Sequence, residues 1–291
     1  MSQVRPILQT CDVSLPDLRR YQEKSITFTE EKTKPDSLNC FRGYRESMLQ
    51  SYYFLLKKQN FMKFSNFETI MSSKRMRRYV NACGGDTRKA MTLYRYNLRL
   101  SQEVFTVISC YEVALRNAID SNLSKTLGVD WLRDSILPGG IFDHPKFSGT
   151  TRIMKKAYAE LSAEGIYSSS KMLSAMEFGV WKYMFSTTQY RATGRTLLQV
   201  FPGKPKTTPS MQYNNLFIFN ELDAVNRLRN RIAHHEPICF LQSNDVISTT
   251  YLRGCYNRIV TLFSWMGISS KELLFGMDHV LALCQRIDGL K

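Results

Sequence analysis

Residues 86–128 read DTRKAMTLYRYNLRLSQEVFTVISCYEVALRNAIDSNLSKTLG and predict one very long helix. Apolar residues recur through this stretch at spacings of three and four, which keeps one face of a helix apolar. Asp86 follows two glycines and is a suitable N-cap, and Gly128 is a suitable residue to end the helix. The element approaches about 40 residues, or about 60 Å at the helical rise, so it predicts a fold built around a long central helix.

Proline placement indicates further helices, because a proline inside a helix costs about 3 kcal/mol. The nine prolines leave long proline-free intervals, and in these intervals we expect helices at 151–164, 173–185, 213–234, 245–266 and 271–287. The chain has no alternating strand pattern and no internal repeat. The predicted fold class is therefore all-α, a helical bundle with long central helices over residues 61–291.

Residues 1–60 differ from the rest of the chain and predict an N-terminal extension. They hold three prolines, a mixed-charge stretch and one helix candidate at about 41–58. We expect this extension to pack on the main domain through a loose tether near 26–36.

The seven cysteines are scattered and include no C-x-x-C pair, which predicts reduced thiols in a cytoplasmic protein. The first residues, MSQVRPILQTCDVS, contain no apolar core of a signal peptide, so we expect none. No stretch approaches the roughly twenty apolar residues of a membrane helix, so we expect no segment that spans a membrane.

Basic residues outnumber acidic ones, with 40 Lys and Arg against 25 Asp and Glu and a net charge of +15. This surplus favours polyanionic partners, nucleic acid first and an acidic membrane surface second; a merely basic soluble protein is the alternative. Residues 61–100 alone hold nine basic and two acidic residues. Their run KRMRRY at 74–79 predicts RNA contacts by Lys74, Arg75, Arg77 and Arg78, with a solvated helix face as the alternative.

Aromatic residues flank this basic run on both sides. They can stack on bases, but we expect them to turn into the core instead. The residues concerned are Phe61, Phe64, Phe67, Tyr94 and Tyr96.

The segment that bears chemistry is RLRNRIAHHEP at 227–237, which closes a predicted amphipathic helix. Its inner stripe is expected to be Phe219, Leu222, Val225, Leu228 and Ile232. Asn230 and His234 are four apart and share a face. Arg229 lies about 140° round the helix, but its long side chain can bend toward the same cleft. The alternative is an ordinary helix end, where the dipole favours cations and Pro237 stops the helix.

The segment at 229–237 resembles the R-x4–6-H signature of HEPN domains, in the form found in Abi-like (abortive infection) proteins. Other segments resemble that group in family order: YVNACGGD at 79–86, LYRYN at 93–97, YEVALRNAI at 111–119, GVDWL at 128–132 and FGVW at 178–181. Together they span about residues 64–266. The resemblance implies a HEPN-type helical bundle and, in many members, metal-free endoribonuclease activity. HEPN members commonly dimerise so that two R-x4–6-H helices meet in one cleft.

Carried over by position, the resemblance makes Arg229 and His234 the catalytic pair and Asn230 the polar residue beside the arginine. The residues expected to support this pair are His235, Glu112, Arg116, Arg227 and Arg231. These residue types suit RNA, which carries its own nucleophile, the 2′-OH, next to each phosphate. Histidine moves a proton at neutral pH, and arginine binds phosphate oxygens. The consecutive residues at 234–236 cannot all face one ion, so we expect neither a metal nor a cofactor.

The first hypothesis is a cytoplasmic endoribonuclease that acts as a toxin or in phage defence. A protein antitoxin, a small RNA or the N-terminal extension would restrain it until infection or stress. The second is a non-catalytic RNA-binding or scaffold protein with the same fold. The third, a basic helical DNA-binding regulator, has no helix-turn-helix spacing to support it. The expected partners are RNA and a second copy of the chain.

Overall fold

The longest helix, α5 (Thr87–Leu127), has 41 residues in the computed structural model, which describes residues 62–242 and 244–291. Asp86 caps its start, because its carboxylate accepts hydrogen bonds from the backbone N–H groups of Arg88 and Lys89 at 2.9 and 3.0 Å. Gly128 follows its last residue with a φ of 88°. The predicted long helix is confirmed together with both of its ends.

Helices make up the regular structure of the described residues, and an isolated antiparallel bridge joins Phe240 to Ile247. The all-α prediction is therefore confirmed. The other α-helices are α3 (Phe64–Met71), α4 (Ser73–Ala82), α6 (Trp131–Asp134), α7 (Ser148–Ala163), α8 (Ser169–Ser174), α9 (Phe178–Tyr183), α10 (Thr187–Ala192), α11 (Asn215–Ala233), α12 (Thr250–Trp265), α13 (Ser270–Leu273) and α14 (Val280–Asp288). Two short 3-10 helices are η1 (Pro145–Phe147) and η2 (Leu197–Val200).

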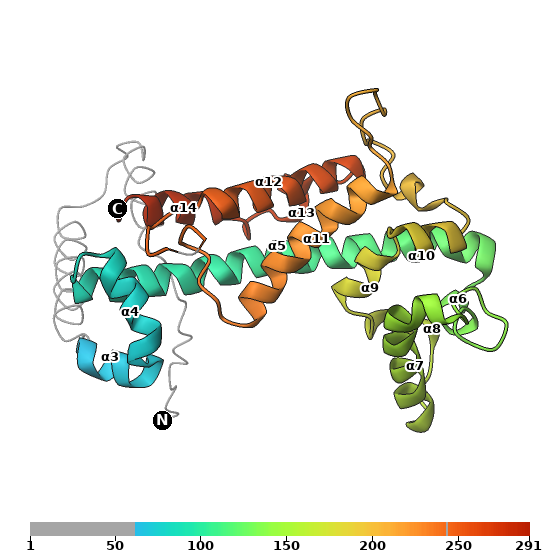
Figure 1. Ribbon diagram of the computed structural model, residues 1–291, viewed down its shortest axis with the longest axis horizontal. Helices are drawn as coiled ribbons and strands as arrows, with labels where there is room; N and C mark the ends of the chain where they lie inside the picture. Colours follow the sequence, from blue (N-terminus) through green and yellow to red (C-terminus); the bar gives the residue numbers. More distant parts are fainter. Residues whose placement is uncertain (1–61, 243) are drawn as a thin grey trace, which may run out of the picture. The chain divides into compact units, whose positions relative to one another are not determined.

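The other helices pack around α5, as Figure 1 shows. The pair α3 and α4 lies against its N-terminal part, α12 and α14 run along one side of it, and α11 crosses it obliquely. The short helices α6 and α8 gather with α7 near its C-terminal end. At regular helical spacing α5 buries one continuous apolar face: Leu93, Leu100, Val104, Ile108, Tyr111, Leu115 and Ile119. Removal of this face from water is what drives the bundle to assemble around α5.

Two stretches were each predicted to form one continuous helix, and in the structure each is divided into two helices. The stretch 173–185 is divided between α8 and α9, because the backbone is extended at Glu177, with a φ of −79° and a ψ of 161°. The stretch 271–287 is divided between α13 and α14 around Gly276, whose φ of 74° cannot continue a right-handed helix. The other three predicted helices beside α5 differ from the observed ones at their ends.

The chain divides into two units, residues 1–62 and residues 63–291, and the helices named above belong to the second unit. The predicted N-terminal extension, with its helix candidate at 41–58, lies outside the described residues. Among the helices that the structure describes, none is long and apolar enough to cross a membrane.

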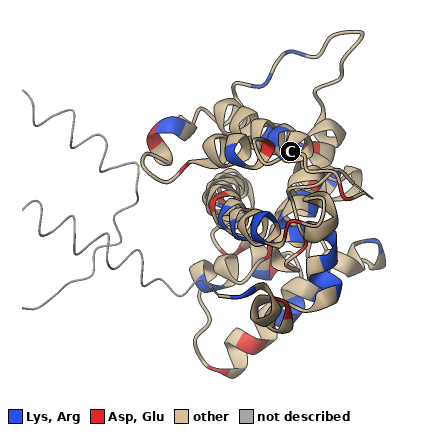
Figure 2. Ribbon diagram, turned by 90° about the vertical axis from the view of Figure 1, so that its left-hand side faces the viewer, with Lys and Arg blue, Asp and Glu red and all other residues tan. Residues whose placement is uncertain are grey.

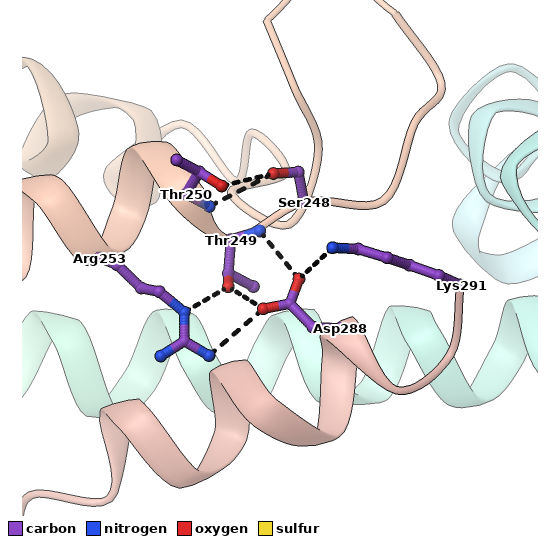
Figure 3. Close-up of polar contacts among 6 residues, drawn as sticks. All are labelled: Ser248, Thr249, Thr250, Arg253, Asp288 and Lys291. Carbon is purple, nitrogen blue, oxygen red and sulfur yellow. Dashed lines mark hydrogen bonds and ion pairs between the residues drawn. The ribbon is translucent and has the colours of Figure 1, made fainter.

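A single carboxylate ties the last helix to the start of α12 (Figure 3). Asp288 accepts hydrogen bonds from the Thr249 hydroxyl at 2.6 Å and from the Thr249 backbone N–H at 3.3 Å. The Arg253 guanidinium and the Lys291 ammonium pair with the same carboxylate at 3.2 and 3.1 Å. These contacts fix the beginning of α12, the helix that forms one wall of the candidate site.

Candidate functional site

The candidate site lies at the C-terminal end of α11. Asn214 caps the start of this helix by accepting a hydrogen bond from the backbone N–H of Phe217 at 3.0 Å. The helix packs on α5, α9 and α12 through four residues of the predicted inner stripe: Leu222, Val225, Leu228 and Ile232. Phe219, expected in the same stripe, is only half-buried. The remaining face of α11 carries polar side chains.

α11 ends in a left-handed turn at His235, whose φ is 55°. The backbone N–H groups of His235 and Glu236 donate to the carbonyl oxygens of Ile232 and Arg231 at 3.0 and 2.8 Å, which is a Schellman helix end. Glycine is usual at this position, because a Cβ at positive φ costs about 1–2 kcal/mol. A histidine here indicates backbone strain directly after His234.

A surface pocket of about 580 Å³ opens beside His234. It is lined by α11, the loop after it and α12, through Ala224, Arg227, Asn230, Arg231, His234, Glu236, Gln242, Tyr251 and Arg258. The structure thus brings together Arg227, Asn230, Arg231 and His234, four of the predicted site residues. Three arginines and a histidine lie against one carboxylate, so the pocket suits a phosphate group.

Carboxylates on α11 hold two of the pocket arginines. Arg227 pairs with Asp223, one turn earlier on the same helix. Asp223 is itself fixed by the buried Lys182 of α9, at an Nζ to Oδ1 distance of 3.0 Å. Arg258 of α12 donates from Nε to Glu221 of α11 at 2.6 Å. Because a guanidinium has five N–H donors, one occupied edge leaves others for a ligand.

Arg231 is held by the loop that follows α11. Its Nη2 donates to the carbonyl oxygen of Pro237 at 2.6 Å, and its Nε lies 3.4 Å from Glu236 Oε2. Its guanidinium also lies over the ring of Tyr251, 5.6 Å from the centroid. Arg231 is therefore oriented both by the loop after α11 and by α12.

Five lining residues escaped prediction from the sequence: Ala224, Glu236, Gln242, Tyr251 and Arg258. Tyr251 and Arg258 are seven residues apart on α12, a spacing that places both on one face of a helix. Burial raises the pKa of the Tyr251 hydroxyl, so the group stays protonated and can donate a hydrogen bond. The spacing alone could have paired these two residues, but it does not indicate that their face turns toward α11.

Arg229 does not line this pocket. Its Nε is buried and has no hydrogen-bond partner among the described residues, and its charge lies near Glu112 of α5. Burial raises the pKa of Glu112, while the positive charges of Arg229 and Arg116 act in the opposite direction. The nearby backbone of Phe178 also acts to lower the pKa of Glu112. Within one chain, the expectation that Arg229 bends into the cleft of His234 is not met.

The basic run of α4 divides into two pairs of residues. Lys74, Arg75 and Arg77 are exposed, and Arg78 is half-buried. Arg75 and Arg78 bind the loop after α11, where Arg75 Nη1 donates to the carbonyl oxygen of His235 at 2.7 Å and Arg78 Nη2 donates to that of Leu241 at 3.1 Å. Elsewhere on this side of the protein, Lys and Arg are spread over several helices (Figure 2). Two of the four predicted RNA-binding residues therefore have partners inside the chain.

The aromatic residues around the basic run belong largely to the core. Phe67 and Tyr94 are buried and meet edge to face, with ring centroids 5.4 Å apart. Phe64 and Tyr96 are partly buried against the same core, and Phe61 lies outside the described residues. The prediction that the rings turn into the core is confirmed for Phe67 and Tyr94.

Fold and pocket together define an all-α protein with a cationic pocket at the end of a helix. Within residues 62–242 and 244–291, no group of three or more His, Cys, Asp or Glu side chains is placed to hold a metal ion. The chain belongs to the Abi-like protein family, which it matches over residues 54–239. Searches of curated proteins and of solved structures give no match. The α12 wall of the pocket lies beyond the matched residues.

Proposed function

We propose that this protein is a metal-independent endoribonuclease of the HEPN type, acting in abortive infection, phage defence or toxin–antitoxin control. The observation that carries the proposal is the pocket in which His234 lies with Arg227, Asn230 and Arg231. Membership of the Abi-like family supports the role in abortive infection. The resemblance of residues 229–237 to the R-x4–6-H signature supports the reaction.

The proposed reaction uses the nucleophile that RNA itself carries. The 2′-oxygen forms a bond to the adjacent phosphorus, the bond to the 5′-oxygen breaks, and the products carry a 2′,3′-cyclic phosphate and a 5′-hydroxyl. One proton leaves the 2′-OH and one reaches the 5′-oxygen, and His234 is the group that moves a proton at this centre. Arg227 and Arg231 hold the phosphate oxygens, whose negative charge grows in the transition state.

We further propose a homodimer in which the α11 helices of two copies face each other. Arg229 faces away from the pocket of its own chain, so a second copy offers a route by which Arg229 and His234 meet. RNA is the proposed substrate. A protein or small-RNA antitoxin is the proposed restraint, because unregulated RNA cleavage harms the cell.

A second candidate is a non-catalytic RNA-binding or scaffold protein with the same fold. One observation favours it, namely the separation of Arg229 from the pocket that contains His234. This candidate predicts that the protein binds RNA and leaves it intact.

The test is incubation of purified protein with labelled single-stranded and loop RNA in EDTA. We expect cleavage that leaves a 2′,3′-cyclic phosphate. His234→Ala should reduce the rate by about 10²–10⁴-fold while the helical circular dichroism is unchanged. His279→Ala is the matched control, since His279 pairs with Glu103 outside the pocket. Binding without turnover by the parent protein would support the scaffold, and cleavage only with added divalent metal would indicate a metal nuclease.

A further inference from the structure

The loop that follows α11 is anchored by arginines of α4. Arg75 Nη1 donates a hydrogen bond to the carbonyl oxygen of His235 at 2.7 Å. Farther along the loop, Arg78 Nη2 donates to the carbonyl oxygen of Leu241 at 3.1 Å. The Arg78 guanidinium also lies over the ring of Phe240, 4.5 Å from its centroid. Arg75 and Arg78 therefore bind backbone groups that lie 160 and 163 residues farther along the sequence.

Other side chains of α4 and α5 complete the anchoring. Arg78 Nε pairs with Asp245 Oδ1 at 3.3 Å, and Asn81 donates to the other oxygen of the same carboxylate at 3.0 Å. Between these points, the buried Asn97 of α5 accepts a hydrogen bond from the backbone N–H of Ile238 at 2.9 Å. The loop is thus held at its beginning, its middle and its end.

The first of these contacts bears directly on His234. The carbonyl oxygen of His235 lies just past the end of α11 and accepts no backbone hydrogen bond among the described residues, so Arg75 supplies its partner. His235 is the residue at positive φ, a conformation that persists only where its surroundings enforce it. A guanidinium bonded to its carbonyl oxygen fixes the plane of the peptide that follows the strained turn. The direction in which His234 leaves the helix is thereby coupled to α4.

We infer that Arg75 and Arg78 are positioning residues, which hold the turn after α11 so that the His234 imidazole stays in its pocket. The inference rests on the proposed role of His234. Arg77 provides the contrast, because it lies on the same helix and is exposed as Arg75 is, but forms no side-chain hydrogen bond or ion pair with the described residues. It carries the same charge as Arg75 and Arg78 without their contacts to the loop.

The alternative is that all basic residues of the run bind RNA phosphates. The two ideas differ most clearly for Asp245→Asn, which weakens the Arg78 anchor while making the chain more positive. If the run binds phosphates, Asp245→Asn should leave RNA binding equal or tighter and the rate unchanged. If the run positions the loop, Asp245→Asn should lower the rate as Arg75→Ala does.

The experiment compares Arg75→Ala, Asp245→Asn and the control Arg77→Ala in the full chain. We expect kcat to fall on the order of 10-fold in the first two variants, with RNA affinity within about 2-fold of the parent. Ring signals of His234 and His235 in NMR spectra of the free protein should shift in the first two variants and stay in place in the third.

The NMR readout separates this inference from the proposed function. If the parent protein does not cleave RNA but the ring signals shift as expected, the proposed reaction is wrong and the anchoring of the turn stands. Should the ring signals stay unchanged in Arg75→Ala and Asp245→Asn, the positioning role is overturned. Equal loss of RNA affinity in Arg75→Ala and Arg77→Ala, with kcat retained, would likewise overturn it.

Discussion

Arg229 of α11 and His234, the residue that ends this helix, are five residues apart in the sequence and face different neighbours. His234 lines a pocket with the side chains of α12, whereas the guanidinium of Arg229 lies near Glu112 of α5. α11 therefore separates the cationic pocket from the region of Arg229 and Glu112, and the pocket obtains its positive charge from Arg227, Arg231 and Arg258. The roles of the arginines can be tested one region at a time.

Arg258→Ala should weaken RNA binding about tenfold and reduce the salt dependence of binding by about one counterion, because one phosphate contact is lost. The measurement is RNA affinity at several salt concentrations. Arg286→Ala on α14 is the control, since this exposed arginine lies outside the pocket. Equal effects of the two substitutions would show that Arg258 acts only through the net charge of the protein.

His235→Gly should raise the free energy of unfolding by about 0.5–1 kcal/mol, because glycine relieves the strain at positive φ but loses more chain entropy on folding. His235→Ala keeps the strain and removes the imidazole, so it should give no gain. Urea denaturation measures both variants. A glycine variant no more stable than the alanine variant would contradict the strained turn. If the imidazole assists cleavage, both variants should cut RNA more slowly.

The elements predicted from the sequence are those whose signals lie within a few residues of one another. α5 has its cap at Asp86, its terminal Gly128 and an apolar stripe, and all three act locally. The breaks at Glu177 and Gly276 escaped prediction, because apolar periodicity continues across a bend in the chain. The α11 half of the pocket could be predicted for the same reason that α5 could.

The other half of the pocket depends on tertiary packing. No local pattern indicates that the face of α12 with Tyr251 and Arg258 turns toward α11. Arg75, Arg77 and Arg78 are likewise equivalent in sequence, and only the packing of α4 against the loop after α11 separates Arg77 from the two arginines that bind backbone. Net charge favours a polyanionic partner, but it cannot assign roles to these individual residues.

Asp288 should make stability depend on pH at acid values. Burial acts to raise its pKa, but hydrogen bonds from Thr249, Lys291 and Arg253 outweigh this and lower it. A lowered pKa means that the carboxylate stabilises the fold above the unfolded-state value of about 3.9, and that this stabilisation is lost as pH falls through the folded-state value. Asp288→Asn should therefore lower the free energy of unfolding by on the order of 1–2 kcal/mol at neutral pH, and by progressively less as the pH falls below about 3.9.

The control for this prediction is Glu160→Gln on α7. Its carboxylate is exposed and lies 3.8 Å from Lys156, and such surface pairs contribute about 0–1 kcal/mol. Urea denaturation of both variants across the acid range makes the comparison. A difference between Asp288→Asn and the parent that does not shrink at low pH would show that the lost packing, and not the ionised carboxylate, is responsible.

Mixing two inactive variants tests whether Arg229 and His234 form a site across two copies of the chain. Arg229→Ala and His234→Ala should each lose cleavage alone, because each site lacks one member of the pair. When the two are coexpressed, every mixed dimer carries one site in which the intact Arg229 of one copy meets the intact His234 of the other. Random assortment makes about half of the dimers mixed, and one of the two sites in each is intact, so about a quarter of the parent rate should return.

A pair that acts within one chain predicts no recovery, because every His234 then remains beside a missing Arg229 or is itself absent. Light scattering must show about twice the 33.8 kDa chain mass for this composite site to exist.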